Sequence, residues 1–233
     1  MTASVSITSL TGKHVLAVCA GYDFSRGVVD GAADLGARIS RVALDVSSAE
    51  RIAAGLDAAI AAAGAPDVVL LNVVPEAAMR PAPIADMSEG AWRTAAMEGL
   101  RTTVRILQAL GPHLKPNGGV VVFVAPSTSL VGTTDMIALT TLLEGQRGLM
   151  KSVARQWGSA GVTLNWIAAS PRAVAPFEGV AFASKPDAVS VALGRAPDPR
   201  KEIAPLLAYL CSEAGRAMTG ATLMLDGGEW MVP

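Results

Sequence analysis

Four side chains of this sequence could move a proton or hold an anion. Glu98 lies in an apolar helical stretch, where burial would raise the pKa of its carboxyl and suit it to act as a general base. Ser127 and Thr140 are hydroxyls, and Arg172 could bind an anionic substrate. Each also has a structural interpretation, because Glu98 could pair with a nearby arginine and Arg172 could simply face solvent. These groups allow a cofactor-independent enzyme, such as a lyase or hydrolase, as one hypothesis.

The cysteines and histidines predict no metal centre. The chain has two of each, Cys19 with Cys211 and His14 with His113, far apart in the sequence. No histidine or lysine lies close to Cys19 in the sequence to stabilise a thiolate. A buried apolar cysteine is therefore favoured over a reactive thiol.

The composition narrows the possible partners. A formal net charge of −1 gives no electrostatic attraction for nucleic acid or an anionic membrane. The N-terminus shows no secretory leader, and no apolar run is long enough to span a bilayer, so we expect a cytoplasmic protein. With 51% hydrophobic and 17% charged residues, the chain is expected to bury a large core and to self-associate.

Short β-branched runs alternate with alanine-rich stretches throughout the chain. This pattern predicts βαβ units and a Rossmann-like, doubly wound parallel sheet in a single α/β domain over residues 1–233. A proline-rich segment at 170–200 is expected to act as a substrate lid or partner contact. The expected strands are 14–19, 38–44, 68–73, 120–124, 162–168 and 222–225, and the expected helices are 26–35, 49–63, 89–110, one ending near 159, and 201–211.

Several stretches resemble the short-chain dehydrogenase/reductase family, in the correct order from end to end. The most specific is Thr219-Gly-Ala-Thr-Leu-Met-Leu-Asp-Gly-Gly, which is similar to the closing pattern of the family. Others are Leu10-Thr-Gly-Lys-His-Val-Leu, Gly36-Ala-Arg-Ile, Leu44-Asp-Val-Ser, Asp67-Val-Val-Leu-Leu-Asn and Gly194-Arg-Ala-Pro-Asp-Pro-Arg. The resemblance supports the same fold.

The resemblance implies a glycine-rich first turn for a nicotinamide dinucleotide, and this chain departs from it. Cys19, Asp23 and Ser25 stand at the three glycine positions, with Tyr22 and Phe24 between them. Only glycine lets the backbone approach a diphosphate closely, and an acidic side chain would repel it. We therefore expect no bound cofactor, with a rearranged loop that still admits NAD(P) as the alternative.

A shortened second βα unit also predicts that no dinucleotide binds. Only residues 40–44 separate the stretch ending at Ile39 from Asp45, so the adenosine half of the pocket is expected to be absent. Asn72 would line the cleft in which the family holds its dinucleotide. We expect its side chain to cap strand and loop backbone groups, as the resemblance to the family implies.

The family's serine, tyrosine, lysine and asparagine have no counterparts here. The aligned positions are Pro126, Leu139, Leu143 and Glu98. Sliding the register by one residue finds Ser127 and Thr140 at the same spacing, but a rotation of about 100° on a helix would turn the Thr140 side chain away from the cleft. The leucines are interpreted as part of a core or interface stripe.

The aromatic loop 22–24, the shortened second unit and Glu98 also resemble the cofactor-free halohydrin dehalogenases. That group keeps a serine, a tyrosine and an arginine where this chain has Pro126, Leu139 and Leu143. The resemblance implies how a nicotinamide pocket can be lost and does not imply dehalogenase activity.

The favoured hypothesis from sequence is a redox-inactive subunit that associates with an active dehydrogenase of the family. Family tetramers pack two helices against a symmetry mate, which implies a homo- or hetero-oligomer through the helices at about 89–110 and 139–159. The alternatives are the cofactor-independent enzyme described above and an NAD(P)-dependent oxidoreductase with displaced catalytic residues.

Overall fold

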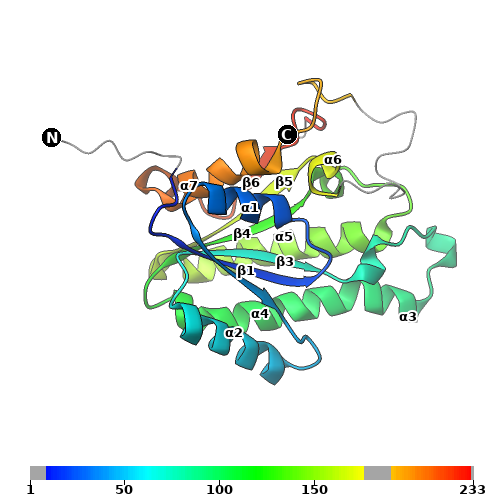
Figure 1. The fold of residues 1–233 in the computed structure, drawn as a ribbon. Helices are drawn as coiled ribbons and strands as arrows, with labels where there is room; N and C mark the ends of the chain where they lie inside the picture. Colours follow the sequence, from blue (N-terminus) through cyan, green and yellow to red (C-terminus); the bar gives the residue numbers. More distant parts are fainter. Residues whose placement is uncertain (1–8, 176–189, 232–233) are drawn as a thin grey trace.

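The computed structural model describes residues 9–175 and 190–231, and in this part of the chain one parallel sheet carries the fold (Figure 1). Its six strands lie in the order β2-β1-β3-β4-β5-β6. Their bounds are β1 His14–Gly21, β2 Arg38–Ala43, β3 Val68–Val74, β4 Gly119–Pro126, β5 Val162–Ala169 and β6 Thr222–Leu225. The predicted doubly wound parallel sheet is therefore confirmed.

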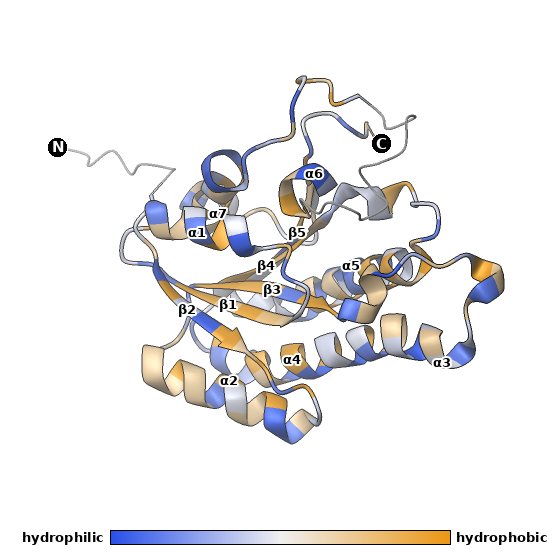
Figure 2. Ribbon diagram, turned by 45° about the vertical axis from the view of Figure 1, so that its right-hand side comes forward, coloured by the Kyte–Doolittle hydropathy of each residue, from blue (hydrophilic) through white to orange (hydrophobic). Residues whose placement is uncertain are grey.

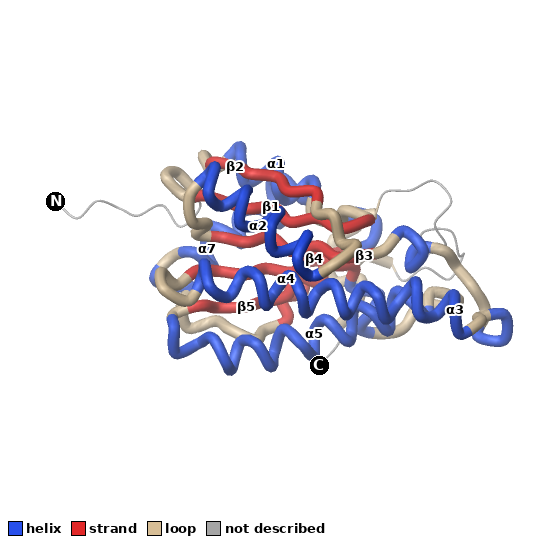
Figure 3. Tube along the Cα trace, turned by 90° about the horizontal axis from the view of Figure 1, so that it is seen from below, coloured by secondary structure: helices blue, strands red, loops and turns tan. Residues whose placement is uncertain are grey.

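Helices cover both faces of the sheet. Helices α1 (Arg26–Asp34) and α7 (Ala204–Cys211) lie on one face, and α2 (Ala49–Ala63), α4 (Glu98–Leu114) and α5 (Ile137–Trp157) lie on the other. Figure 3 shows α2, α4 and α5 side by side across the strands. Two short helices, α3 (Glu89–Trp92) and α6 (Pro171–Val174), stand outside these layers.

The core lies between the sheet and these two helical layers, which is why the central strands are continuous apolar runs (Figure 2). All seven residues of β3, including Asn72, are buried. Burying one such valine or leucine side chain stabilises the fold by about 1.5–3 kcal/mol.

Helix α2 illustrates how local chemistry sets the boundaries. Ser48 caps it, since its side chain accepts a hydrogen bond from the Arg51 amide at 3.2 Å. Gly64 ends it at a φ of 84°, a conformation that favours glycine. The expected helix at 49–63 is thus confirmed.

The helix expected at 89–110 starts where predicted but differs inside and at its C-terminal end. It starts as α3, passes through a π-helical turn at Arg93–Met97, and then continues as α4 through Pro112 to Leu114. Pro112 lacks the amide proton of a helical hydrogen bond, which favours a helix end before it. The last turn forms nevertheless, because Leu110 and Leu114 are both fully buried.

The segment expected at 170–200 is described only at its two ends, as α6 and as residues 190–200, and residues 176–189 lie outside the described part. None of the described helices is both long and apolar enough to cross a membrane.

Candidate functional site

The strand order places a switch point between β1 and β3, where successive connections leave in opposite directions. Ligands of open α/β sheets bind outside the carboxyl ends of the strands at such a point. Here the two strand ends are joined directly, because the Tyr22 amide donates a hydrogen bond to the Val74 carbonyl at 2.7 Å. Gly21 makes this approach possible: it has a φ of 91°, and a Cβ added to it would lie 2.0 Å from the Val74 oxygen.

The loop from β1 to α1 folds its second aromatic side chain inward. Phe24 is only 1% exposed and packs in the core, and its ring meets that of Tyr22 edge-on with the centroids 4.8 Å apart. The Phe24 amide donates to Asn72 Oδ1 at 3.4 Å, and Asn72 Nδ2 donates to the Val124 carbonyl at 3.0 Å. Asn72 therefore caps strand and loop groups, as expected from the sequence.

Asp23 directs its carboxylate back into the same loop. Its Oδ1 accepts hydrogen bonds from the Ser25 amide at 2.9 Å and the Ser25 hydroxyl at 2.6 Å. Ser25 itself is 3% exposed. The acidic group at the expected diphosphate position is thus held by its own turn.

Two hollows meet at the start of α1. The central hollow has a volume of about 500 Å³ and reaches from this loop to α6 and Pro199. The edge hollow, of about 380 Å³, lies beside the edge strand β2. Both are lined by Asp23, Arg26 and Asp30, so the two spaces share one border. The central hollow is further lined by Gly21, Tyr22, Phe24, Gly27, Glu76, Ala173, Val174 and Pro199, and the edge hollow by Ala17, Cys19, Ser25, Arg41, Val42 and Ala43.

Two titratable groups at the hollows are held in their protonated forms. Burial, followed by the charges of Asp23 and Glu76, raises the pKa of the Tyr22 phenol to about 12, against a lowering by Arg26. The same groups raise the pKa of the Cys19 thiol to about 11. Cys19 therefore lacks the thiolate that nucleophilic chemistry needs at neutral pH.

The residues present can accommodate a dinucleotide. The two hollows are of the size that ligand sites have, and they share a border that includes Arg26, whose side chain is exposed. The amides of the first turn of α1 have no partner within the helix and can receive an anion. Of the two aromatic side chains expected to block the site, Phe24 turns into the core and Tyr22 lines the central hollow without filling it. The edge hollow leaves a second space beside β2.

The positions aligned with the family's catalytic groups lie in the core or in ion pairs. Leu139 and Leu143 are 2% and 1% exposed on α5, and Pro126 ends β4. Glu98 forms the expected ion pair, with its Oε1 3.2 Å from Arg101 Nη1. The side chains of Leu139, Leu143 and Pro126 cannot transfer a proton.

The other three side chains predicted to transfer a proton or bind an anion lie apart from one another. Ser127 is fully buried and its hydroxyl has no partner within the described residues. Thr140 is half-buried on α5. Arg172 Nε lies 3.8 Å from the buried Glu229 carboxylate, which also accepts a hydrogen bond from Ser170. In the described part of the chain no hydrogen bond or ion pair joins any two of the four candidates, and no group of residues there could hold a metal.

The sequence reasoning missed Arg26, Arg41 and Glu76. Arg26 and Asp30 are four residues apart on α1, a spacing that places both on one helix face and could have identified them. Glu76 and Val174 come from distant segments, and only the folded chain brings them to one hollow.

Residues 6–229 match the family model described as enoyl-(acyl carrier protein) reductase. The chain belongs to the short-chain dehydrogenase/reductase family. This family membership agrees with the resemblance seen in the sequence, and it covers nearly the whole chain.

Similar proteins are named as enzymes. D-threitol dehydrogenase of Mycolicibacterium smegmatis is 30% identical over 94% of this chain and 93% of that protein. A 12alpha-hydroxysteroid dehydrogenase of a Clostridium species is 28% identical over 85% of this chain and 78% of its own length.

Solved structures share the fold at lower identity. A gluconate 5-dehydrogenase from Burkholderia cenocepacia, in complex with NADP and tartrate, has a TM-score of 0.80 at 19% identity, covering 97% of this chain and 98% of that one. A 3-ketoacyl-(acyl-carrier-protein) reductase from Brucella melitensis, complexed with NADH, has a TM-score of 0.77 at 20% identity, covering 95% and 99%.

Two expectations from the sequence are therefore wrong. The redox-inactive subunit is contradicted by relatives that are named dehydrogenases over most of the chain's length. The expected absence of a nicotinamide cofactor is contradicted by the match to a reductase family model, together with NADH- and NADP-bound structures of the same fold. The physical reason lies in the loop: of the two aromatic side chains expected to occupy the diphosphate site, Phe24 is buried in the core and Tyr22 lines the central hollow.

Proposed function

We propose that this protein is an NAD(P)-dependent oxidoreductase with displaced catalytic residues. The observation that carries the proposal is the pair of adjoining hollows at the carboxyl ends of β1 and β3, which meet at the first turn of α1. The dehydrogenase relatives that span nearly the whole chain support the same activity. When bound, the nicotinamide group would supply or accept a hydride.

The chain's own residues suggest how the dinucleotide is held. Arg26 lies on the border of the two hollows, where a diphosphate linking two nucleotides would pass. Arg41 lines the edge hollow and pairs with Asp30 on α1, so its guanidinium would be available to a ribose bound in that space. Asp23 opposes the diphosphate electrostatically, and its hydrogen bonds with Ser25 limit how closely it faces the anion.

The catalytic groups would differ from those of the family, because Leu139, Leu143 and Pro126 carry no transferable proton. The proton of the reaction then has to come from another side chain at the hollows.

Charge changes at the border of the hollows test the binding mode. We expect Asp23→Asn to bind NADPH or NADH about 5- to 20-fold more tightly than the unaltered chain, because it removes a like charge from the diphosphate site. Arg26→Ala should bind about 10-fold more weakly. Titration of nicotinamide fluorescence measures both affinities. Arg216→Ala is the control that leaves affinity unchanged, because Arg216 lies with residues at the amino ends of the strands, away from the hollows. Equal affinities in all four proteins would contradict the proposed site.

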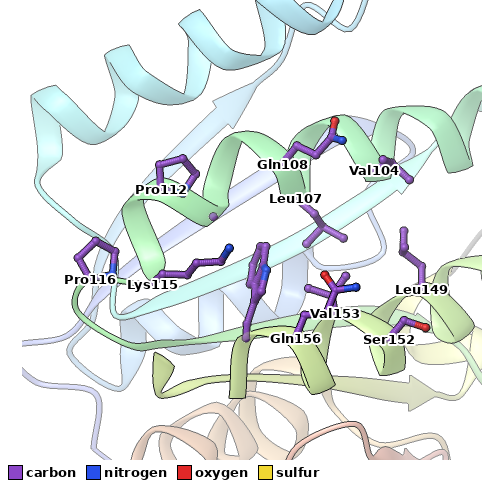
Figure 4. A pocket seen from close by; sticks show the side chains of 12 residues that line it. Val104, Leu107, Gln108, Pro112, Lys115, Pro116, Leu149, Ser152, Val153 and Gln156 are labelled. Atoms are coloured by element: carbon purple, nitrogen blue, oxygen red, sulfur yellow. The ribbon is translucent and has the colours of Figure 1, made fainter. Parts of the chain in front are cut away.

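We also propose that the chain associates with copies of itself through α4 and α5. A groove of about 580 Å³ runs between these helices and is lined by apolar side chains such as Val104, Leu107 and Leu149 (Figure 4). Trp157 of α5 approaches α4 there, since a Cβ added at Gly111 would lie 3.3 Å from its ring. The indole of Trp157 is covered at one end by Lys115, whose Nζ lies 5.4 Å from the ring centroid. No described helix covers this outer layer (Figure 3), and the large hydrophobic share of the sequence favours covering it with a second copy.

A charge in this groove should prevent the association. Val104 on α4 is 38% exposed, so Val104→Asp can be solvated in the monomer but would be buried in the dimer. Val46, in the loop before α2, is 39% exposed and provides the matched control Val46→Asp. Light scattering after gel filtration should show a smaller mass only for Val104→Asp. A monomeric unaltered chain, or equal masses for all three proteins, would refute the interface.

A further inference from the structure

A single phenol lies at the central hollow. The chain has two tyrosines, Tyr22 and Tyr209. Tyr209 lies on α7, where its hydroxyl donates to the Ala214 carbonyl at 3.4 Å. Tyr22 lines the central hollow, so any proton that a tyrosine supplies there comes from Tyr22.

Contacts with β3 and with the core help to set the position of Tyr22. Its amide is bonded to the end of β3 through the Val74 carbonyl at 2.7 Å. Its ring packs edge-on against Phe24, which is anchored in the core. The preceding Gly21 fits only because it has no Cβ. The phenol is therefore carried by a fixed turn, and pre-organised groups of this kind are what acid catalysis needs.

The surroundings of Tyr22 join the ends of three strands. Glu76 follows β3, and Ala173 and Val174 follow β5, and all three line the hollow with Tyr22. This is the side of the hollow away from β2 and the edge hollow, where the reacting end of a dinucleotide would lie if its other end occupied the edge hollow.

We propose that the Tyr22 phenol is the general acid for reduction of an aldehyde or ketone in the central hollow, an inference that rests on the proposed function. When bound, the reduced dinucleotide would supply the hydride that the carbonyl carbon receives as the carbon–oxygen π bond breaks. The carbonyl oxygen takes the phenolic proton, which yields an alcohol and the oxidised dinucleotide. Solvent water then returns a proton to the Tyr22 phenolate.

The charges around Tyr22 keep the phenol protonated, which favours carbonyl reduction over alcohol oxidation. Burial, Asp23 and Glu76 raise the pKa of the phenol, Arg26 lowers it, and the net value is about 12. The group is thus protonated at every pH below about 11 and can donate. The reverse reaction needs the phenolate, so the rate of alcohol oxidation should increase about tenfold per pH unit up to a pH near 12 or the onset of unfolding, whichever comes first.

Tyr22→Phe tests the inference, with Tyr209→Phe as the matched control. The probes are NADPH and a panel of ketones that includes 9,10-phenanthrenequinone, and the readouts are the NADPH dissociation constant and kcat. We expect Tyr22→Phe to bind NADPH within threefold of the unaltered chain but to lose about 100- to 10,000-fold in kcat. Tyr209→Phe should retain both properties.

Each other outcome overturns a particular claim. A Tyr22→Phe protein that keeps kcat within tenfold shows that another group donates the proton. An unaltered chain that binds NADPH and reduces no ketone of the panel also refutes the role of Tyr22. Failure of the unaltered chain to bind NADPH instead refutes the proposed function itself, and the inference falls with it. An oxidation rate that levels off near pH 9 would exclude a phenol with this pKa.

Discussion

Gly21→Ala is expected to destabilise the fold by about 3–5 kcal/mol, one of the largest effects of any small substitution in this chain. The added Cβ would lie 2.0 Å from the Val74 oxygen and 2.8 Å from its carbonyl carbon, both of which are backbone atoms that cannot rotate away. A φ of 91° adds strain for any residue with a Cβ. For a chain of this size, the melting temperature should fall by roughly 10 °C.

Gly12→Ala separates the steric clash from the backbone strain. Gly12 has a φ of 79°, and nothing lies within 4 Å of its added Cβ, so this variant suffers the backbone strain without the clash. It should lose only about 1 kcal/mol. Thermal unfolding followed by circular dichroism measures both variants. Equal losses would mean that β1 and β3 are not joined tightly at the switch point.

Asn72→Leu is the second substitution with a large expected effect. Asn72 is 2% exposed, and its side chain satisfies the Phe24 amide and the Val124 carbonyl. Leucine has a similar size but would leave both backbone groups buried and unpaired, at a cost of about 1–3 kcal/mol each. The loop that borders both hollows would also lose its link to β4, so we expect NADPH to bind at least about 10-fold more weakly.

Asn165→Leu is the matched control for this variant. Asn165 is fully buried in β5, donates to the Met218 carbonyl at 2.8 Å and accepts from the Ala221 amide at 3.2 Å. Its loss should destabilise the fold by a similar amount, but it lies outside the loop and the hollows. Denaturant unfolding and NADPH titration of both proteins distinguish the roles. If both variants lose affinity equally, general destabilisation explains the effect and Asn72 has no special part in the site.

The strands were predictable because their pattern is local. The strand at 222–225 was predicted at its observed bounds, and the apolar run predicted as a strand at 120–124 lies within β4, seven of whose eight residues are buried. The end of α4 was not predictable in the same way. The Gly111-Pro112 pair signals a helix end locally, whereas the buried Leu110 and Leu114 favour one more turn.

The site was less predictable than the fold. The types of residue in the loop after β1 were readable, but the direction of the Phe24 side chain depends on Asn72, 48 positions later, and on the core beneath it. The central hollow likewise needs Glu76, Val174 and Pro199 to come together. An inference from residue size alone therefore predicted a filled site where the folded chain leaves a space.

A crystal structure of the chain grown with NADPH tests the central claim most directly. The account predicts the dinucleotide along the carboxyl ends of β1 and β3, with its diphosphate beside Arg26, one nucleoside in the edge hollow and the nicotinamide near Tyr22. Well-ordered crystals grown at saturating NADPH in which both hollows hold only solvent would contradict it, as would a dinucleotide bound elsewhere on the molecule.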